Sequence, residues 1–132
     1  MACAVAWAQS PVGSWRSIDD KTGKPRAEIR IVEAGGKLVG RIERSVAADA
    51  GKEPARCTKC PGDRADQPLI GLEIIRGVDT TARDGWFEGG EILDPDSGKV
   101  YTLRLKPEDG KLLVRGMIGP FYRTQTWERL SP

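Results

Sequence analysis

Two cysteines stand three positions apart in the segment Cys57-Thr-Lys-Cys60, which is surrounded by proline, glycine and charged residues. Such a pair can form a structural disulfide, act as a redox dithiol or supply half of a zinc site shared by two chains. A redox dithiol needs a lowered thiol pKa, usually at a helix N-terminus, and this segment predicts no helix. Pro61 stands where covalent haem attachment requires a histidine, which excludes that chemistry. We therefore expect a local Cys57–Cys60 disulfide and no metal site.

Residues 122–130 alternate as expected for a strand with two different faces. One face carries Arg123, Gln125, Trp127 and Arg129. If Trp127 points into a core, the period of two takes Arg123 and Gln125 inward with it. A buried guanidinium then needs an internal carboxylate, for which Glu73 and Glu88 are candidates, or an anionic ligand.

These side chains predict one end of a binding cavity, with a polar head and an apolar wall. The predicted ligand-binding residues are Arg123, Gln125, Trp127, Trp86, Tyr101 and Leu103. Such a set suits a small amphipathic or hydrophobic molecule, for example an amphipathic acid. The alternative interpretations are a filled core with an internal Arg–Glu pair, and an outward face that leaves Arg123 in solvent.

The residue types and their spacing exclude several common kinds of catalytic and metal site. The chain of 132 residues contains no histidine, so it lacks Ser–His and Cys–His pairs and histidine metal ligands. Glu88 and Glu91 fall on opposite faces of a predicted strand, so they cannot act together on one glycosidic bond. The segment 94–98 resembles the start of a calcium loop, but Leu105 occupies the position of the final glutamate. We predict no catalytic residue, no cofactor and no enzymatic activity.

The elements that position these residues are short strands. From Pro11 onward, apolar and polar residues alternate with a period of two, in runs separated by glycine, proline and aspartate turns. The predicted strands cover Gly13–Ile18, Ala27–Glu33, Lys37–Arg44, Leu69–Arg76, Trp86–Leu93, Val100–Lys106, Lys111–Ile118 and Tyr122–Leu130. Hairpin connections predict an antiparallel meander, and rolling the meander into a barrel removes its two open edges. The predicted fold class is therefore all-β, an eight-stranded antiparallel up-and-down β-barrel.

One predicted connection, residues 45–68, is much longer than the others and contains both cysteines of the Cys57–Cys60 pair. A structureless segment of this length in a compact domain is usually functional or disordered. A second functional hypothesis is therefore a protein–protein interaction module that presents this disulfide-stapled loop to an envelope partner. A thiol oxidoreductase using the two cysteines is a third hypothesis, ranked below both.

Charge and hydropathy exclude two classes of partner. Lys and Arg number 21 against 19 Asp and Glu, and the two signs alternate along the chain. Because no basic stripe forms, we predict no nucleic-acid partner. No apolar run approaches the roughly 18 residues that a membrane-spanning helix needs, so we predict no stable membrane insertion.

Residues 1–10 read as the tail end of a secretory signal peptide. The stretch is small and apolar, and Ala6-Trp7-Ala8 fits the pattern that signal peptidase cuts after, although a complete signal is longer. We interpret 1–10 as a signal remnant and 11–132 as a single barrel domain. The alternative is a disordered extension of a cytosolic protein.

Gly13-Ser-Trp15 at the start of the first predicted strand resembles the Gly-x-Trp marker of lipocalin-like barrels. In those barrels an arginine near the end of the last strand accompanies the tryptophan. The resemblance implies structural roles for Trp15 and Arg129. The indole would plug one end, while the guanidinium would stack on its face and hydrogen-bond to the backbone there.

Five segments, taken in order, resemble a bacterial family known as domain of unknown function 2147. They are Gly13–Pro25, Cys57–Gly62, Gln67–Gly71, Gly89–Pro95 and Arg123–Trp127. That family consists of small exported proteins with a lipocalin-like barrel and no established biochemical role. The resemblance implies a periplasmic or secreted protein. Together with the predicted cavity, it favours an exported binding protein for a small amphipathic or hydrophobic ligand.

Overall fold

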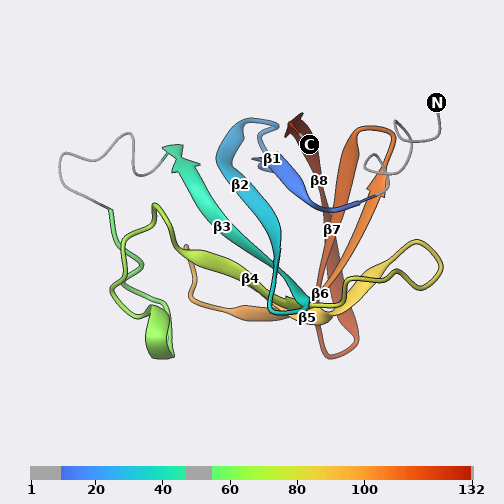
Figure 1. Ribbon diagram of the computed structural model, residues 1–132. Coiled ribbons are helices and arrows are strands. Elements are labelled where there is room, and N and C mark those ends of the chain that lie inside the picture. The colour runs from blue at the N-terminus through green and yellow to red at the C-terminus, as the bar shows by residue number, and fades with distance from the viewer. Residues whose placement is uncertain (1–9, 47–54, 132) are drawn as a thin grey trace.

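The computed structural model describes residues 10–46 and 55–131, which form a closed antiparallel barrel of eight strands (Figure 1). Each strand pairs with the next along the chain, and β8 pairs with β1. The strands are β1 (Gly13–Ile18), β2 (Pro25–Ala34), β3 (Lys37–Ser45), β4 (Glu73–Val78), β5 (Phe87–Leu93), β6 (Val100–Glu108), β7 (Lys111–Ile118) and β8 (Phe121–Ser131). The predicted all-β, up-and-down barrel is thus confirmed.

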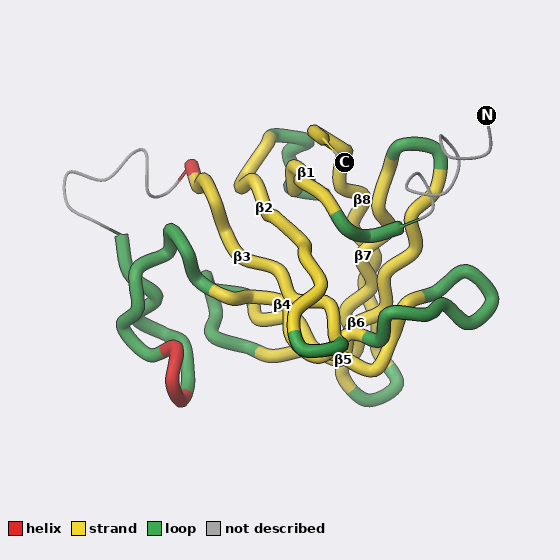
Figure 2. Tube along the Cα trace, in the orientation of Figure 1, coloured by secondary structure: helices red, strands yellow, loops and turns green. Residues whose placement is uncertain are grey.

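Turn chemistry sets where the strands end. β1 and β7 have the predicted bounds. A tight turn at Gly35-Gly36 connects β2 to β3, and another at Asp109-Gly110 connects β6 to β7. All four turn residues have positive φ, which glycine adopts without cost and aspartate tolerates. Figure 2 shows that the rest of the described chain is mostly connections, with a short 3-10 helix, η2 (Gly62–Arg64), before β4.

The fourth strand differs from its predicted bounds. It was expected over Leu69–Arg76, but β4 begins only at Glu73. Leu69 and Leu72 are buried, yet they belong to a turn in which Gly71 has a φ of +88°. Their backbone bonds are those of an irregular turn: the amide of Leu69 donates to the Ala55 carbonyl, and the Leu72 carbonyl accepts from the amide of Ile42 in β3. Apolar residues at a barrel opening therefore pack as a loop although their pattern resembles a strand.

An up-and-down barrel has two ends with different connections. The β1–β2, β3–β4, β5–β6 and β7–β8 connections lie at one end, here called the mouth. The N-terminal segment and the β2–β3, β4–β5 and β6–β7 connections lie at the other, here called the closed end. In Figure 1 the green segment that leads into β4 projects on the left.

The core fills the barrel from the closed end toward the middle. Inward-facing side chains that are almost completely buried there are Trp15, Ile31, Leu38, Val78, Leu103, Leu105 and Leu112. Gly40 makes room on the β3 wall, because a Cβ atom at this position would lie 3.1 Å from the Ile75 side chain. Side chains therefore fill the half of the barrel nearer the closed end, and any space for a ligand lies nearer the mouth.

Trp15 and Arg129 together seal the closed end. The Trp15 side chain is fully buried, and its indole Nε1 donates a hydrogen bond to the Pro11 carbonyl at 2.7 Å. The Arg129 guanidinium lies 4.1 Å from the centre of the indole ring. It also donates hydrogen bonds to the carbonyls of Ser10 at 2.7 Å and Val12 at 3.1 Å. These contacts fix the segment before β1 across the barrel opening.

Of the predicted signal remnant, residues 1–9 lie outside the described part of the chain. The same holds for residues 47–54 of the predicted 45–68 loop. Within the described residues, no helix has the length and apolar character needed to span a bilayer.

Candidate functional site

A cavity of about 670 Å³ opens at the mouth of the barrel. Its floor and walls are largely apolar, and its edge is formed by charged residues of the β1–β2 and β5–β6 connections and of the strands β2 and β8. The apolar lining residues are Pro25, Ala27, Ile29, Ile42, Val46, Leu69, Ile74, Ile92, Leu93, Pro95, Val114 and Trp127. Residues of the β1–β2 connection, from Asp19 to Lys24, supply much of the charged edge.

The floor is built from cross-strand pairs. Ile29 of β2 faces Ile42 of β3, and Val114 of β7 faces Gln125 of β8. Trp127 is almost fully buried beside them, and its indole Nε1 donates to the Gln125 side-chain oxygen at 3.1 Å. The amide of Gln125 therefore satisfies the one polar group of the floor and leaves an apolar surface above it.

Tyr101 lines the same cavity from β6. It stands against Gly116 of β7, where an added Cβ would lie 3.3 Å from the Tyr101 Cβ. The absence of a side chain at Gly116 leaves the space that the Tyr101 ring needs. A phenol at this height gives the cavity wall an apolar ring with a polar tip.

Arg123 lies at the rim, where it pairs with Asp20 of the β1–β2 connection. Its Nε donates to Asp20 Oδ2 at 2.6 Å, and its Nη2 donates to the other carboxylate oxygen. The guanidinium holds the pKa of Asp20 below its ordinary value, and the carboxylate raises the pKa of Arg123. More than half of the Arg123 side chain is exposed, so this charge is held at the water boundary and not inside the core.

A second ion pair joins the other side of the β1–β2 hairpin to the β5–β6 turn. Arg26, near the start of β2, pairs with Asp96. Asp19 organises the turn between these two contacts by accepting hydrogen bonds from the amides of Lys21 and Thr22, which lower its pKa. The β1–β2 connection is thus tied to β8 on one side and to the β5–β6 turn on the other.

The disulfide segment forms another part of the mouth wall. Cys57 and Cys60 are joined, with their Cα atoms 5.4 Å apart, and both are buried. The predicted disulfide is therefore present. The segment packs on the β5–β6 turn, where Cys57 Sγ lies 3.6 Å from the Pro95 carbonyl and Gly98 stands directly against the backbone of Lys59.

Ion pairs anchor the far side of this segment to β4. Arg76 pairs with both oxygens of Asp63, at 3.1 and 2.7 Å, and with Glu73 at 2.5 Å. These contacts lower the pKa of Asp63 and raise that of Arg76. Arg64 is buried and donates to the Glu73 carbonyl at 3.1 Å. The segment is thus fastened to the barrel from both sides.

Four of the six predicted ligand-binding residues come together at the cavity. Arg123, Gln125, Trp127 and Tyr101 all line it. Leu103 does not, because it is fully buried in the core below.

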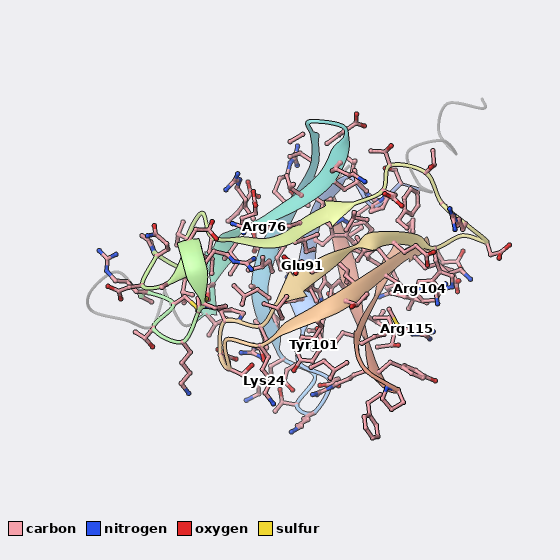
Figure 3. All side chains as sticks on the ribbon, turned by 90° about the horizontal axis from the view of Figure 1, so that it is seen from below. Lys24, Arg76, Glu91, Tyr101, Arg104 and Arg115 are labelled. Atoms are coloured by element: carbon pink, nitrogen blue, oxygen red, sulfur yellow. A yellow bond between two sulfur atoms is a disulfide. The ribbon has the colours of Figure 1, made fainter. Side chains whose placement is uncertain are left out.

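The placement of Trp86 on the cavity wall was wrong. Trp86 lies in the β4–β5 connection, before β5 begins, and packs on the outside of the barrel. Arg104 and Arg115 lie 4.8 and 4.7 Å from its ring centre, and Lys106 lies at 5.7 Å. Figure 3 shows Arg104 and Arg115 close together on the outer wall, away from Lys24 at the mouth. The period of two fails here because the β5 register shifts between Phe87 and Gly90.

Glu73 and Glu88 were expected as internal partners for Arg123. Glu88 instead pairs with Arg104 on the outer wall at 2.9 Å, and Glu73 pairs with Arg76 and Arg41. The partner that the structure provides, Asp20, belongs to a segment that the sequence pattern marked only as a turn. Its Asp-Asp pair beside two lysines could have signalled a charged edge, but nothing in the sequence indicates which strand it meets.

A second hollow of about 490 Å³ lies on the wall formed by β4, β5 and β6. Arg76 and Glu91 lie close together there, as Figure 3 shows. The Arg76 guanidinium is already engaged by Asp63 and Glu73, so it offers little charge to a ligand. The mouth cavity is therefore the better candidate site.

An eight-stranded, closed up-and-down barrel with one sealed end and an open mouth is a lipocalin-like fold. A family model described as an uncharacterised protein conserved in bacteria, DUF2147, matches residues 13–129, and the chain belongs to this family. The structure is similar to that of protein HP1028 from Helicobacter pylori, which belongs to the lipocalin family. The TM-score is 0.74 at 18% sequence identity, over 91% of this chain and 82% of that one. No curated protein sequence matches the chain.

Proposed function

We propose that this protein binds a small hydrophobic or amphipathic molecule in the mouth cavity, without catalysing a reaction. The observation that carries the proposal is the cavity itself, with about 670 Å³ of space above an apolar floor. Sites for small molecules typically measure about 300 to 1,000 Å³ and combine apolar walls with a few polar groups. The fold of a lipocalin-like barrel supports the same role.

The polar groups of the cavity favour an amphipathic ligand with an anionic head. Arg123 at the rim, Gln125 and Tyr101 offer hydrogen-bonding groups on one side of the cavity. A ligand carboxylate near Arg123 would take the place of Asp20 in the same bidentate geometry. The apolar part of the ligand would then rest on Ile29, Ile42 and Trp127.

We propose a periplasmic or secreted location, with residues 11–132 as the mature domain. The Cys57–Cys60 disulfide supports this proposal, because disulfides persist in oxidising compartments. Thiol alkylation of the protein in fractionated cells is the test. Protection of both cysteines in an envelope or secreted fraction is expected, and free thiols in a cytoplasmic fraction would contradict the proposal.

Displacement of a dansyl-labelled fatty acid tests the binding role. Ala27 lines the cavity from β2, so Ala27→Phe should fill it and weaken binding by about tenfold or more. Ala34→Phe is the matched control, because it makes the same change at the exposed end of the same strand. If both variants and the wild type bind the fatty acid equally, the fatty acid does not bind in the mouth cavity.

The same assay tests the anionic head. Wild-type protein should prefer a long-chain acid to the alcohol of equal length, and Arg123→Gln should abolish that preference. An acid and an alcohol that bind equally would show that Arg123 is only a structural partner of Asp20.

An interaction module built on the 45–68 loop was the alternative. In the described part of that loop, both cysteines face the core and the chain packs on the β5–β6 turn. No observation on this segment favours a protein partner, so we do not propose one.

A further inference from the structure

Exposed apolar side chains gather around the mouth. The large apolar side chains that are exposed among the described residues are Val32, Val46, Ile70, Ile118, Phe121, Tyr122 and Leu130. Of these seven, five lie at the mouth end, and only Val32 and Leu130 lie toward the closed end. Exposed apolar residues scattered singly need no explanation, but a group at one end of a barrel marks an interaction surface.

The group forms two patches on opposite sides of the opening. Val46 and Ile70 belong to the β3–β4 connection, and Ile118, Phe121 and Tyr122 form the tip of the β7–β8 hairpin. These two connections are four strands apart in a barrel of eight. A single surface that contacts both patches must therefore lie across the mouth.

The hairpin tip is the more prominent patch. Phe121 is 77% exposed and Tyr122 is 66% exposed, and neither lines the cavity. Arg115 fixes the Tyr122 ring, because its guanidinium lies 4.6 Å from the ring centre and its Nε donates to Thr124 at 2.9 Å. The other face of Arg115 meets Trp86. The tip is thus a preformed aromatic projection and not a loose loop.

Positive charge lies beside the tip. The Asp20–Arg123 pair holds the β1–β2 connection against β8, two residues from Phe121. This connection carries Lys21 and Lys24, which form no ion pair with any described residue. It also carries Asp19 and Asp20, of which Asp20 is paired with Arg123, so the connection and Arg123 together have a net charge of +1. The rim therefore offers ammonium groups next to aromatic rings, a combination that suits the boundary between lipid headgroups and acyl chains.

We propose that the mouth end docks on the surface of a bilayer that contains anionic lipids, with the β7–β8 tip inserted at the headgroup boundary. Phe121, Tyr122 and Ile118 supply the apolar contact, and Lys21 and Lys24 supply attraction to the headgroups. A bilayer fits better than a protein, because the two patches surround an open cavity and the tip is convex. The docked barrel presents its cavity to the membrane, but docking does not require the cavity to be occupied.

Co-sedimentation with vesicles tests this proposal in the absence of added ligand. The wild type should bind vesicles of phosphatidylcholine with phosphatidylglycerol more tightly than vesicles of phosphatidylcholine alone. Phe121→Ser should lower the partition coefficient by about tenfold on both kinds of vesicle. Lys21→Gln and Lys24→Gln should each lower it by about fivefold, on anionic vesicles only. None of these side chains is buried, so all variants should fold.

Leu130→Ser is the matched control, because Leu130 is 39% exposed near the closed end, and its substitution should leave vesicle binding unchanged. The proposal is overturned if wild type and Phe121→Ser bind vesicles equally, or if neither binds. It is also overturned if the wild type is a dimer that does not bind vesicles and Phe121→Ser makes it a monomer, because the mouth end then docks on a second copy of the chain. Fatty-acid binding is measured without vesicles, so the two proposals fail separately.

Discussion

Arg129 shows how one side chain, packed on Trp15, helps to close one end of a barrel. Its guanidinium covers the Trp15 ring and binds two backbone carbonyls of the segment before β1. Partial burial lowers the pKa of Arg129. Arginine side chains stay protonated in proteins, so the guanidinium is a cation here. The Arg129 guanidinium both stacks on the Trp15 ring and donates two hydrogen bonds, so it holds the segment before β1 together with the hydrogen bond from Trp15 to Pro11.

Arg129→Met should therefore destabilise the fold. Methionine keeps much of the apolar contact with Trp15 but leaves the carbonyls of Ser10 and Val12 without their donors. The free energy of unfolding, measured with urea, should fall by about 2 kcal/mol. Arg16→Met is the control, because Arg16 makes only a 3.9 Å contact with Glu128 at the surface and should change stability by less than about 0.5 kcal/mol. Equal effects would mean that Arg129 has no special role.

The sequence predicted which β8 side chains face the cavity better than it predicted the partner of Arg123. Period two placed Gln125 and Trp127 correctly, because β8 is regular through them. It placed Arg123 inward as well, but β8 extends past the barrel at that point, so the guanidinium reaches the rim and Asp20. Trp86 was misplaced because it precedes its strand and the register of β5 shifts between Phe87 and Gly90. A period describes the inside of a strand, and functional side chains often lie at its ends.

At the scale of elements, the mouth is an assembly of connections that hold one another. The β5–β6 turn binds the β1–β2 hairpin through Asp96 and supports the disulfide segment through Pro95 and Gly98. The strand pattern and the turn residues were readable from the sequence. The contacts between connections were not, because they depend on the barrel bringing together segments that are about 40 to 70 residues apart.

Gly98→Ala tests this coupling. Gly98 has a φ of +77°, and an added Cβ would overlap the Lys59 carbonyl. Gly110 has a nearly equal φ of +76° and open space around it. Gly110→Ala should thus cost only the backbone strain of about 1 kcal/mol, whereas Gly98→Ala should cost about 2 kcal/mol more and loosen the disulfide segment.

Urea unfolding measures both costs, and proteolysis within residues 55–72 reports on the segment. Equal losses of stability in the two variants, with unchanged proteolysis, would show that the turn and the disulfide segment are independent.

At the scale of the whole molecule, the absence of histidine shapes the response to pH. Histidine is the side chain that ordinarily titrates between pH 6 and 8, and the chain has none, so the charge of the barrel should change little in this range. The carboxylates of Asp19, Asp20, Asp63 and Asp79 have pKa values lowered by hydrogen bonds and ion pairs. A lowered pKa in the folded state contributes stability above the unfolded value, near 3.8, and this contribution is lost as the pH falls through the lowered pKa.

The urea midpoint should therefore stay constant from pH 8 to 6 and fall steeply below about pH 4. Asp20→Asn and Asp63→Asn should each reduce the size of the acid-induced fall. A midpoint that changes between pH 8 and 6, or that rises below pH 4, would contradict the ion-pair assignments.

Ligand binding inside the mouth cavity is the central functional proposal, and the tryptophan indole signals provide a direct measurement of it. Trp127 lies on the cavity floor, Trp15 at the sealed end and Trp86 on the outer wall. In a 15N-labelled sample titrated with dodecanoic acid, the indole N–H signal of Trp127 should shift and saturate while those of Trp15 and Trp86 stay in place. A titration that leaves Trp127 unmoved, or that shifts only Trp86, would contradict a ligand site within the barrel.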